Sequence, residues 1–430
     1  MNQSSCIMKI LRIFGFCILC LSGIFSVSHA QGGPGEPAYV RMGAARVNIT
    51  PEEPVPMSGY AARTEPFTGV HDSLFATALY FKSTDNSLLL ITADLIGYSS
   101  QFIEETRKKI SEEIDVVPEH ILISAVHNHG APVSKAYERD VPETVENYVK
   151  DLQKKFIAIS VRAAESITPV KMGTGKGHCE LNINRRAEFA DGGIWLGRAS
   201  DKPCDHEVSI TRFDDLEDRT LAVLINWPCH ATASGPGNTQ ITGDWPGAAA
   251  RYFNKQAGDG VVVSITAGAS GDINPIYGPG NDFNEIEAVG YHVGKTAWES
   301  YRQIPTMPVE TLEALNGTLV LPGKQRGKDR FPQESYESGP DVEISLTAFR
   351  IGHLVLAGIS GELMNEIGTD IKNRSPFSNT VLMTHCNGSS GYICTDKAFA
   401  EGGYEIQVTR LMPGAETALS SELLQMINRL

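Results

Sequence analysis

Short apolar runs alternate with longer amphipathic segments in the first part of the chain. Residues 87–94 (SLLLITAD) and 120–126 (HILISAV) are apolar and bounded by polar residues, as expected of strands buried on both faces. Apolar positions then recur at helical spacing over residues 101–114 and 145–166. The pattern therefore predicts two consecutive strand-helix units.

The same alternation continues toward the end of the chain. It predicts buried strands at 221–227, 261–267 and 380–385, a hairpin at 347–359 that turns at Gly352-His353, and helices near 284–303, 361–372 and 414–428. The polar, turn-rich residues 322–340 predict a surface loop or a lid. Together these elements predict an α/β fold of layered β-sheets flanked by helices, with substantial parallel sheet.

The first 30 residues differ from the rest. Lys9 and Arg12 precede an apolar run over residues 13–27, which ends at Ser28-His29-Ala30. This order predicts a secretory signal peptide at residues 1–30. The run is shorter than the roughly 20 residues that a membrane-spanning helix requires. We therefore expect a secreted or periplasmic protein with no integral membrane segment after cleavage, whose folded part is residues 31–430.

The chain of 430 residues is acidic, with 51 Asp and Glu against 37 Lys and Arg and a net charge of −14. This charge repels polyanions, and no basic stripe with interleaved aromatic residues is present, so nucleic acid is excluded as a partner. A small-molecule or lipid substrate is expected instead. The sequence leaves the oligomeric state open.

Five cysteines follow residue 30, namely Cys179, Cys204, Cys229, Cys386 and Cys394. An odd number cannot all pair within one chain. Bridges between Cys386 and Cys394 and between Cys179 and Cys204 are plausible in an oxidising compartment, although the sequence does not fix the connectivity. No C-x-x-C pair exists, which excludes a zinc finger, and Cys229 is interpreted as a small buried residue.

Two histidines, His127 and His129, follow the strand predicted at 120–126. Residues i and i+2 of an extended segment point to the same side, so both imidazoles can converge on one point. Such a pair suits metal binding or acid-base chemistry, and two histidines in a surface loop are the alternative.

Other candidates also follow predicted strands. His230 comes just after the strand at 221–227, and Asp244 is a carboxylate that could orient a histidine from behind, although a lone histidine in such a place is more often structural. Glu362 stands where a helix begins, and stabilisation of the helix N-terminus explains it equally well. The glycine-rich loop that carries Tyr392, with Tyr404 beyond it, is on composition alone only a loop.

Residues 269–275 (ASGDINP) follow the strand predicted at 261–267. Their glycine and proline impose a tight turn that can present backbone N–H groups or a side chain to a substrate. The flanking pattern of a G-x-S-x-G nucleophile elbow is missing, so a serine triad is disfavoured.

Taken in order, these segments resemble the catalytic domain of the neutral/alkaline, non-lysosomal ceramidase family. The resemblance begins at Gly43-Ala-Ala-Arg-Val-Asn-Ile-Thr50-Pro51 and continues over nearly all of residues 31–430. No single motif is very specific, and the ordered set carries the resemblance. Its members are Met57-Ser-Gly-Tyr60, Gly69-Val-His71-Asp72, Thr92-Ala-Asp94, the H-x-H segment, Asn182-Ile-Asn184-Arg185, Asn226-Trp227 with His230, Gly243-Asp244, Gly271-Asp272, Gly361-Glu362, Ser390-Gly-Tyr392 and Tyr404-Glu405.

The resemblance implies a zinc-dependent amidohydrolase of ceramide or a related N-acyl lipid, in which metal-activated water attacks the amide. It implies a Zn²⁺ site formed by His127, His230, Glu362 and Tyr392, a ligand set that suits this metal. It also implies that Arg185 binds substrate and that His129 and Tyr404 stabilise the developing oxyanion, His129 also returning a proton to the leaving group.

Three departures from the family pattern bear on the substrate. The family's G-D-V-S-P-N turn has a serine where this chain has Asn274, whose amide cannot replace a hydroxyl nucleophile. The resemblance covers no C-terminal β-sandwich domain, which ceramidases usually carry. The expected T-x-E-E-Y stretch reads Thr395-Asp-Lys-Ala-Phe399.

These departures keep two rivals to ceramide hydrolysis open. One is an enzyme of the same fold that acts on an acylated or uronic-acid-containing carbohydrate as an esterase, deacetylase or lyase. The other is a non-catalytic, metal-stabilised binding protein. Asn274 is assigned to the site in either enzyme, orienting or polarising the substrate.

Overall fold

The computed structural model describes residues 39–135, 141–258, 260–327 and 330–430. The signal peptide predicted at residues 1–30 lies outside these residues. Among the described residues, no helix combines the length and the apolar character that crossing a membrane would take.

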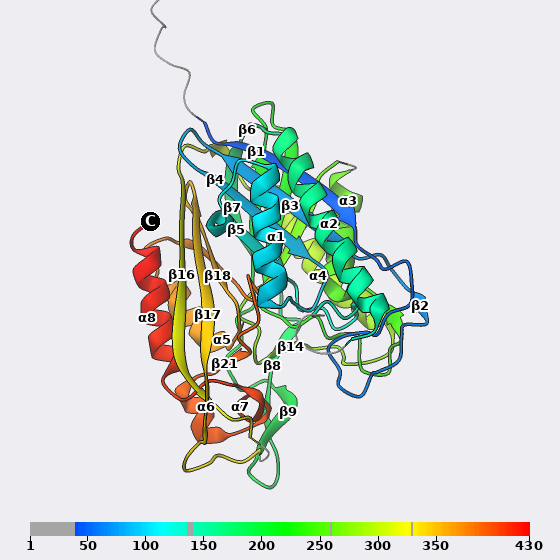
Figure 1. Ribbon diagram of the computed structural model, residues 1–430, viewed down its shortest axis with the longest axis vertical. Coiled ribbons are helices and arrows are strands. Elements are labelled where there is room, and N and C mark those ends of the chain that lie inside the picture. Colours follow the sequence, from blue (N-terminus) through cyan, green and yellow to red (C-terminus); the bar gives the residue numbers. More distant parts are fainter. Residues whose placement is uncertain (1–38, 136–140, 259, 328–329) are drawn as a thin grey trace, which may run out of the picture. The chain divides into compact units, whose positions relative to one another are not determined.

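Three large β-sheets form the framework (Figure 1). The first has the strand order β5-β4-β3-β1-β6, the second β13-β11-β10-β7-β15, and the third β16-β17-β18-β20. Their bounds are Arg41–Asn48 (β1), Phe75–Lys82 (β3), Ser87–Ala93 (β4), Ile121–Ala125 (β5), Thr168–Pro169 (β6), Lys171–His178 (β7), Glu207–Asp214 (β10), Thr220–Trp227 (β11), Val262–Ala267 (β13), Met307–Pro308 (β15), Leu312–Lys324 (β16), Ser338–Ile351 (β17), Leu354–Ile359 (β18) and Asn379–Met383 (β20).

Each large sheet contains one parallel pair: β4 with β5, β11 with β13, and β18 with β20. Their other pairs are antiparallel, so the expectation of substantial parallel sheet is wrong in extent. The reason is connection length, because tight hairpins such as the turn at Gly352-His353 permit only antiparallel pairing, whereas a parallel pair needs a crossover. Each crossover here contains a helix, α1, α3 or α5.

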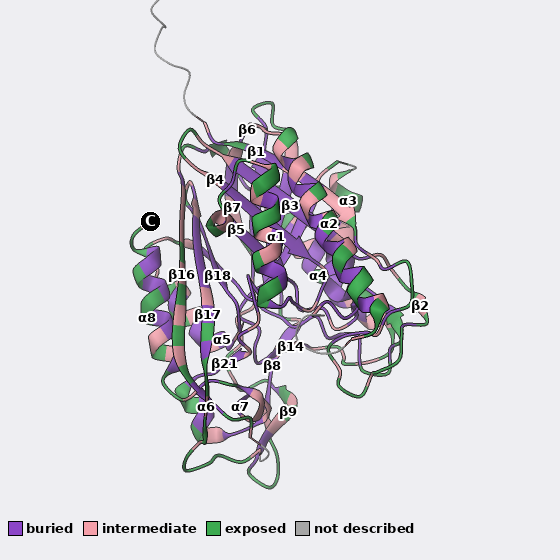
Figure 2. Ribbon diagram, viewed as in Figure 1, coloured by how far each residue is buried: buried purple, intermediate pink, exposed green. Residues whose placement is uncertain are grey.

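Helices cover the outer faces of the sheets. α1 and α2 pack on the first sheet, α3 and α4 on the second, and α5 and α8 on the third. In Figure 2 these helices carry both buried and exposed residues, as amphipathic helices do. Their bounds are Ser100–Glu113 (α1), Glu143–Glu165 (α2), Asp244–Ala257 (α3), Phe283–Tyr301 (α4), Asn365–Arg374 (α5) and Ala415–Ile427 (α8).

The inner faces of the three sheets share one central core. In β4, Leu88 and Leu90 enter this core, whereas Leu89 and Ile91 face α1 and α2. β11 and β18 alternate in the same way between the central core and their own helices. The continuous apolar runs of the sequence follow from this burial on both faces.

Smaller elements complete the fold. Their bounds are Gly69–Val70 (β2), Pro118–His120 (η1), Asn182–Glu188 (β8), Ile194–Ala199 (β9), Gln240–Ile241 (β12), Ile273–Pro275 (β14), Glu362–Leu363 (β19), Tyr392–Ile393 (β21), Asp396–Glu401 (α6) and Tyr404–Val408 (α7). The predicted loop at 322–340 is shorter than expected, because β16 extends to Lys324 and β17 begins at Ser338.

The plausible disulfides do not form. Cys179, Cys204, Cys229, Cys386 and Cys394 are all free thiols. Closeness in sequence is a poor guide here, because Cys386 and Cys394 stand in different elements: Cys386 follows β20 and its thiol donates to the carbonyl oxygens of Met383 and Thr384, while Cys394 follows β21.

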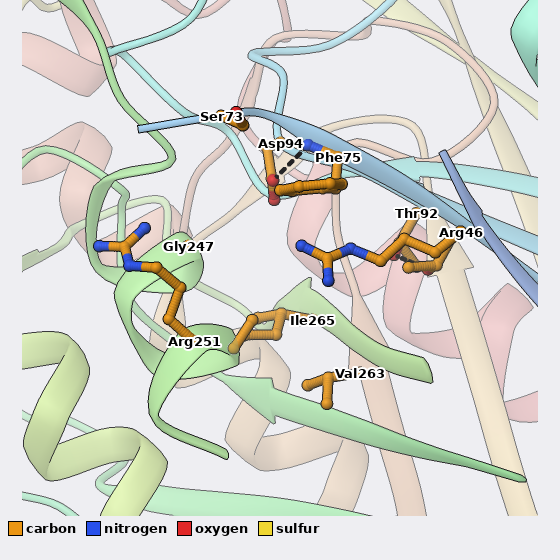
Figure 3. Close-up of a pocket in the computed structure, with 11 residues that line it drawn as sticks. Arg46, Ser73, Phe75, Thr92, Asp94, Gly247, Arg251, Val263 and Ile265 are labelled. Atoms are coloured by element: carbon orange, nitrogen blue, oxygen red, sulfur yellow. Dashed lines mark hydrogen bonds between the residues drawn. The ribbon is translucent and has the colours of Figure 1, made fainter. Parts of the chain in front are cut away.

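A cavity of about 300 Å³ lies where β1, β3 and β4 meet α3 and β13. In Figure 3, the side chain of Arg46 extends toward the carboxylate of Asp94, whereas Arg251 lies on the other side and pairs with Asp72 and Glu287. Burial raises the pKa of Asp94 to about 7, although the N–H of Phe75 and the two guanidinium groups oppose the shift and Asp72 adds to it. A buried carboxylate with such a pKa makes the stability of the fold depend on pH.

We predict that Gly43→Ala lowers the free energy of unfolding by about 2 kcal/mol or more. A Cβ on Gly43 in β1 would stand 1.9 Å from the carbonyl oxygen of Ala163 in α2. Gly317→Ala in β16 is the matched control, because its Cβ would meet nothing closer than Met426 Sδ at 3.7 Å. Urea denaturation of both variants measures the difference, and equal midpoints would contradict the close contact.

We predict that Asp94→Asn flattens the dependence of stability on pH. Between pH 4 and 7 folded Asp94 holds a proton that the unfolded chain has lost, so wild-type stability falls as pH rises through this window. The stability of the variant relative to wild type should therefore rise by on the order of 2 kcal/mol between pH 5 and pH 8. Denaturation at both pH values tests this, and parallel profiles would argue against it.

Candidate functional site

The three large sheets direct the ends of their parallel strands to one point. His127 follows β5 of the first sheet, His230 follows β11 of the second, and Glu362 follows β18 of the third. Because each residue comes just after the carboxyl end of its strand, the docking of the sheets brings the three side chains together. The structure thus brings His127, His230 and Glu362 together, and the ring of His129 lies beside that of His127, with centroids 5.0 Å apart.

The histidines are oriented by hydrogen bonds on their outer nitrogens. Nδ1 of His127 donates to the carbonyl oxygen of Ile96 at 2.9 Å, and Nδ1 of His230 donates to that of Ser270 at 2.6 Å. A carbonyl oxygen only accepts, so Nδ1 of each ring carries a proton, and in the neutral ring Nε2 then has a lone pair. These Nε2 atoms lie 3.5 Å and 3.4 Å from Oε2 of Glu362.

Buried atoms without partners gather at this point. Among the described residues, eight buried side-chain nitrogen and oxygen atoms have no hydrogen bond, and four of them are Nδ1 and Nε2 of His129, Nε2 of His385 and Oε2 of Glu362. Buried polar atoms are normally satisfied, so such a concentration is informative. Their donor chemistry, imidazole nitrogens with a carboxylate oxygen, fits a bound divalent metal.

Two overlapping groups here have ligand atoms within 4.8 Å of one another: His127, His129 and His230, and His127, Glu362 and His385. Burial lowers the pKa of His127 to about 4, and it lowers the pKa of His129 and His385 well below the usual range. All three are therefore neutral at pH 7. Burial raises the pKa of Glu362, but the neighbouring histidines lower it further, and it stays ionised. Neutral imidazoles and a carboxylate are the forms that ligate a metal.

The backbone at the site is held in unusual conformations. His127 and His385 have φ values of 59° and 55°, in the left-handed region that non-glycine residues rarely adopt. Their rings stack with centroids 3.9 Å apart. Strain of this kind persists where the surrounding structure fixes the side chains, and it concentrates at functional sites.

His385 is the residue that the sequence reasoning missed. It was read only as the end of the strand predicted at 380–385. Its signal was present, since it follows β20 just as His127 and His230 follow their strands. Asp244, by contrast, was a candidate to orient a histidine and does not do so. Its carboxylate accepts the N–H groups of Ala233 and Ser234 and orients no histidine, so it fixes the loop after His230 instead.

Tyr392 reaches the cluster through a short parallel pairing. β19 and β21 set Glu362 opposite Tyr392. Nη2 of Arg185 donates to the phenolic oxygen of Tyr392 at 3.0 Å. Burial raises the pKa of Tyr392, and the guanidinium of Arg185 opposes this shift. The phenolic oxygen is thus placed beside Glu362 with a cation on its other side.

Arg185 links the remaining predicted residues. Its Nη1 donates to Oδ1 of Asn274 at 3.2 Å and lies 3.4 Å from Nε2 of His230. Its guanidinium carbon lies 5.7 Å from the ring centroid of Tyr404. Asn274 in β14 therefore lies within the site, as predicted, and its side chain contacts Arg185.

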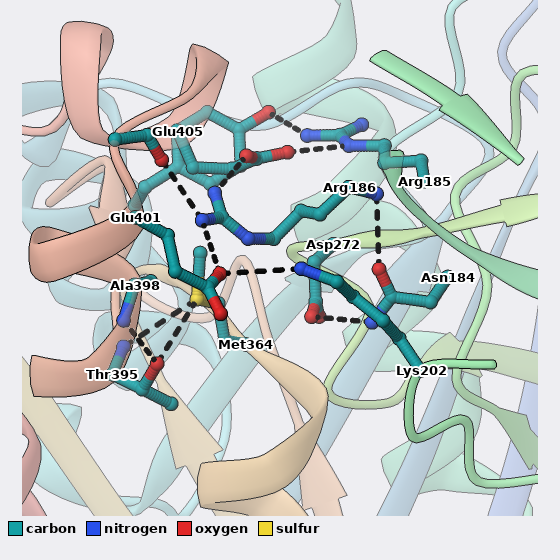
Figure 4. Close-up of polar contacts among 12 residues, drawn as sticks. Asn184, Arg185, Arg186, Lys202, Asp272, Met364, Thr395, Ala398, Glu401 and Glu405 are labelled. Carbon is teal, nitrogen blue, oxygen red and sulfur yellow. Dashed lines mark hydrogen bonds and ion pairs between the residues drawn. The ribbon is translucent and has the colours of Figure 1, made fainter. Parts of the chain in front are cut away.

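A buried ion-pair network holds Arg185 in place (Figure 4). Glu405 accepts Nε of Arg185 and Nη1 of Arg186, both at 2.8 Å. Arg186 also binds Glu401, which in turn binds Lys202. A buried pair is costly to break because it leaves one charge uncompensated, so this network fixes the arginine on which Tyr392 and Asn274 depend.

A cavity of about 400 Å³ opens above the cluster. His127, His129, Glu362, Tyr392 and Tyr404 line it, whereas Arg185, His230 and Asn274 lie behind this lining. The ring of His129 packs edge-on against Tyr60, and Gly59 leaves it room, since a Cβ there would stand 2.4 Å from Nδ1. The structure therefore brings together all eight residues that were predicted for the site.

Several known proteins are similar to this chain. Neutral ceramidase of Drosophila pseudoobscura pseudoobscura is 26% identical over 296 residues, which is 63% of this chain and 40% of that protein. Neutral ceramidase of Drosophila melanogaster is 27% identical over 266 residues, 56% of this chain and 37% of that protein. The matches thus span well under half the length of these relatives.

Solved structures show the same fold. The crystal structure of neutral ceramidase from Pseudomonas aeruginosa matches 92% of this chain and 75% of that chain with a TM-score of 0.75 and 18% identity. A ceramidase complexed with C2 matches 91% of this chain and 76% of that chain with a TM-score of 0.77 and 18% identity. Residues 40–285 match the family described as neutral/alkaline non-lysosomal ceramidase, N-terminal. The chain therefore belongs to the neutral/alkaline non-lysosomal ceramidase family.

Proposed function

We propose that the protein is a zinc-dependent hydrolase that cleaves the amide bond of ceramide or a related N-acyl lipid. One observation carries the proposal. Nε2 of His127, Nε2 of His230 and the unpartnered Oε2 of Glu362 lie close together in a buried cluster below a cavity. The names of the similar proteins support the substrate class.

In this proposal His127, His230, Glu362 and Tyr392 hold the zinc. The metal would supply Lewis-acid polarisation of an acyl carbonyl and lower the pKa of water. His385, stacked on His127, belongs to the same cluster and is an additional candidate ligand.

The other residues act on the substrate. His129 and Tyr404 line the cavity and are placed to donate hydrogen bonds to an oxyanion, and His129 to return a proton to the leaving nitrogen. Arg185 fixes Tyr392 and Asn274 from behind. Asn274 has no hydroxyl, so it serves as an orienting group and attack comes from water.

One observation favours the second candidate, hydrolysis or elimination on an acylated or uronic-acid-containing carbohydrate. The cavity is lined by charged and hydroxyl side chains, including Lys135, Arg326, Ser389 and Arg410, and by few aliphatic ones. Residues 1–30 support export in either case, and we propose that the enzyme acts outside the cytoplasm.

We predict that the purified protein carries about one zinc per chain and that His230→Ala and Glu362→Gln each reduce this content at least about tenfold. Removing one donor leaves the remaining ligands with an incomplete shell. His353→Ala is the control, because His353 lies on the hairpin turn after β17 and bonds Thr174. Elemental analysis of dialysed protein, with circular dichroism as the folding check, gives the result. Full zinc retention in both site variants would exclude this ligand set.

We predict that the zinc-loaded enzyme hydrolyses N-octanoylsphingosine and that His129→Ala lowers kcat/KM by roughly 100-fold or more, because a donor to the oxyanion is lost. Asn274→Ala should lower it by about tenfold, through the freed Arg185. Asn428→Ala, on the exposed end of α8, should have no effect. Turnover of acetylated uronic-acid oligosaccharides without turnover of the sphingosine amide would select the second candidate.

A further inference from the structure

Three basic side chains line the cavity above the cluster, and they come from three separate segments. Lys135 lies beyond the H-x-H segment, Arg326 follows β16, and Arg410 follows α7. Segments so far apart in the chain meet here only because of the fold, so the grouping is a property of the cavity and not of one basic stretch of sequence.

The charge in the cavity is opposite to that of the protein. The whole chain has 51 acidic against 37 basic residues, yet among the described residues that line the cavity the one carboxylate is that of Glu362. Glu362 faces His127 and His230 within the cluster. Its charge is therefore directed to the cluster, and Lys135, Arg326 and Arg410 line other parts of the cavity.

Two of the cations are held side by side. Nζ of Lys135 donates to Oγ of Ser389 at 2.7 Å, and Nη2 of Arg410 donates to the carbonyl oxygen of the same residue at 2.7 Å. The two side chains therefore stand beside one residue at the wall of the cavity, where an anion could contact both.

These basic side chains suit an anionic ligand. Guanidinium and ammonium groups at the wall of a partly enclosed site attract carboxylate, sulfonate or phosphate, and the planar fork of arginine suits a carboxylate best. An uncharged sphingolipid amide offers no such group. The apolar lining, Ile96, Val133 and Val408, is small beside the polar one.

We propose that Lys135, Arg326 and Arg410 form a subsite for an anionic group of the substrate. The inference rests on the proposed function and deepens it: the enzyme cleaves an acyl compound that bears a carboxylate, or a similar small oxyanion, near the scissile bond. The anion lies in the same cavity as His129 and Tyr404, which places the charged group within reach of the cluster.

Equilibrium binding to the zinc-loaded full chain tests the subsite. The probes are N-octanoylglycine, N-octanoyltaurine and uncharged N-octanoylethanolamine, measured by calorimetry at low salt. We expect the two anions to bind at least about tenfold more tightly than the ethanolamide, with the carboxylate ahead of the sulfonate and the preference weakened by added salt. Equal affinity for the three probes, or binding of none, would overturn the proposal.

Variants of Lys135 and Arg410 test whether these residues cause the preference for anionic probes. Lys135→Gln and Arg410→Gln should each reduce the preference for the anion several-fold and leave the affinity for the ethanolamide unchanged. Lys154→Gln, an exposed position on α2 far from the cavity lining, is the matched control and should keep wild-type values. An undiminished preference in both cavity variants would contradict the assignment.

Hydrolysis of the same three compounds separates the two proposals. If none is cleaved while the preference in binding holds and depends on Lys135 and Arg410, the subsite is supported and the proposed amidohydrolase function fails. If all three are cleaved with equal kcat/KM and bind equally, the proposed function stands and the anion subsite is refuted.

Discussion

The close approach of two buried imidazole nitrogens to one buried carboxylate is the constraint around which this fold is arranged. Nε2 of His127 and Nε2 of His230 lie 3.5 Å and 3.4 Å from Oε2 of Glu362, which has no hydrogen-bond partner, and burying such polar atoms is costly unless they are paired. The carbonyl oxygens of Ile96 and Ser270 fix the protons on the far side of each ring. A proton shared within the cluster would weaken this geometry, whereas a divalent ion would complete it.

Behind the cluster, buried ion pairs hold the side chains in fixed positions. Arg185 is bound at once to Glu405, Tyr392 and Asn274, and Glu405 also binds Arg186. A buried network of this kind adds little to stability compared with apolar packing of the same volume. Its value lies in position, because a guanidinium fixed on several sides holds the phenolic oxygen of Tyr392 and the amide of Asn274 to one arrangement.

The sequence allowed much of the fold to be predicted, and the reason is visible in β4. Leu88 and Leu90 enter the central core while Leu89 and Ile91 meet the helices, so a strand buried on both faces leaves an unmistakable apolar run. Strand direction was not predictable in the same way. The hairpin at Gly352-His353 and the crossover through α5 produce similar apolar patterns, although one gives an antiparallel and the other a parallel neighbour.

Residues of the site were predictable to different degrees. His127 and His230 follow apolar strands, a position that marks them without any knowledge of relatives. Glu362 and Tyr392 meet through a pairing of two-residue strands, which is too short to leave a pattern, and only the family resemblance identified them. His385 had the same signal as the other histidines but no counterpart in that resemblance.

His127, His230 and Glu362 follow strands of three different sheets, and this has a topological consequence. A single ion bound by His127, His230 and Glu362 would join three distant points of the chain and close two long loops, as a pair of cross-links would. The chain has free thiols and no disulfide among its described residues. A metal bound there would act as a cross-link between the three sheets, and its loss would loosen their docking together.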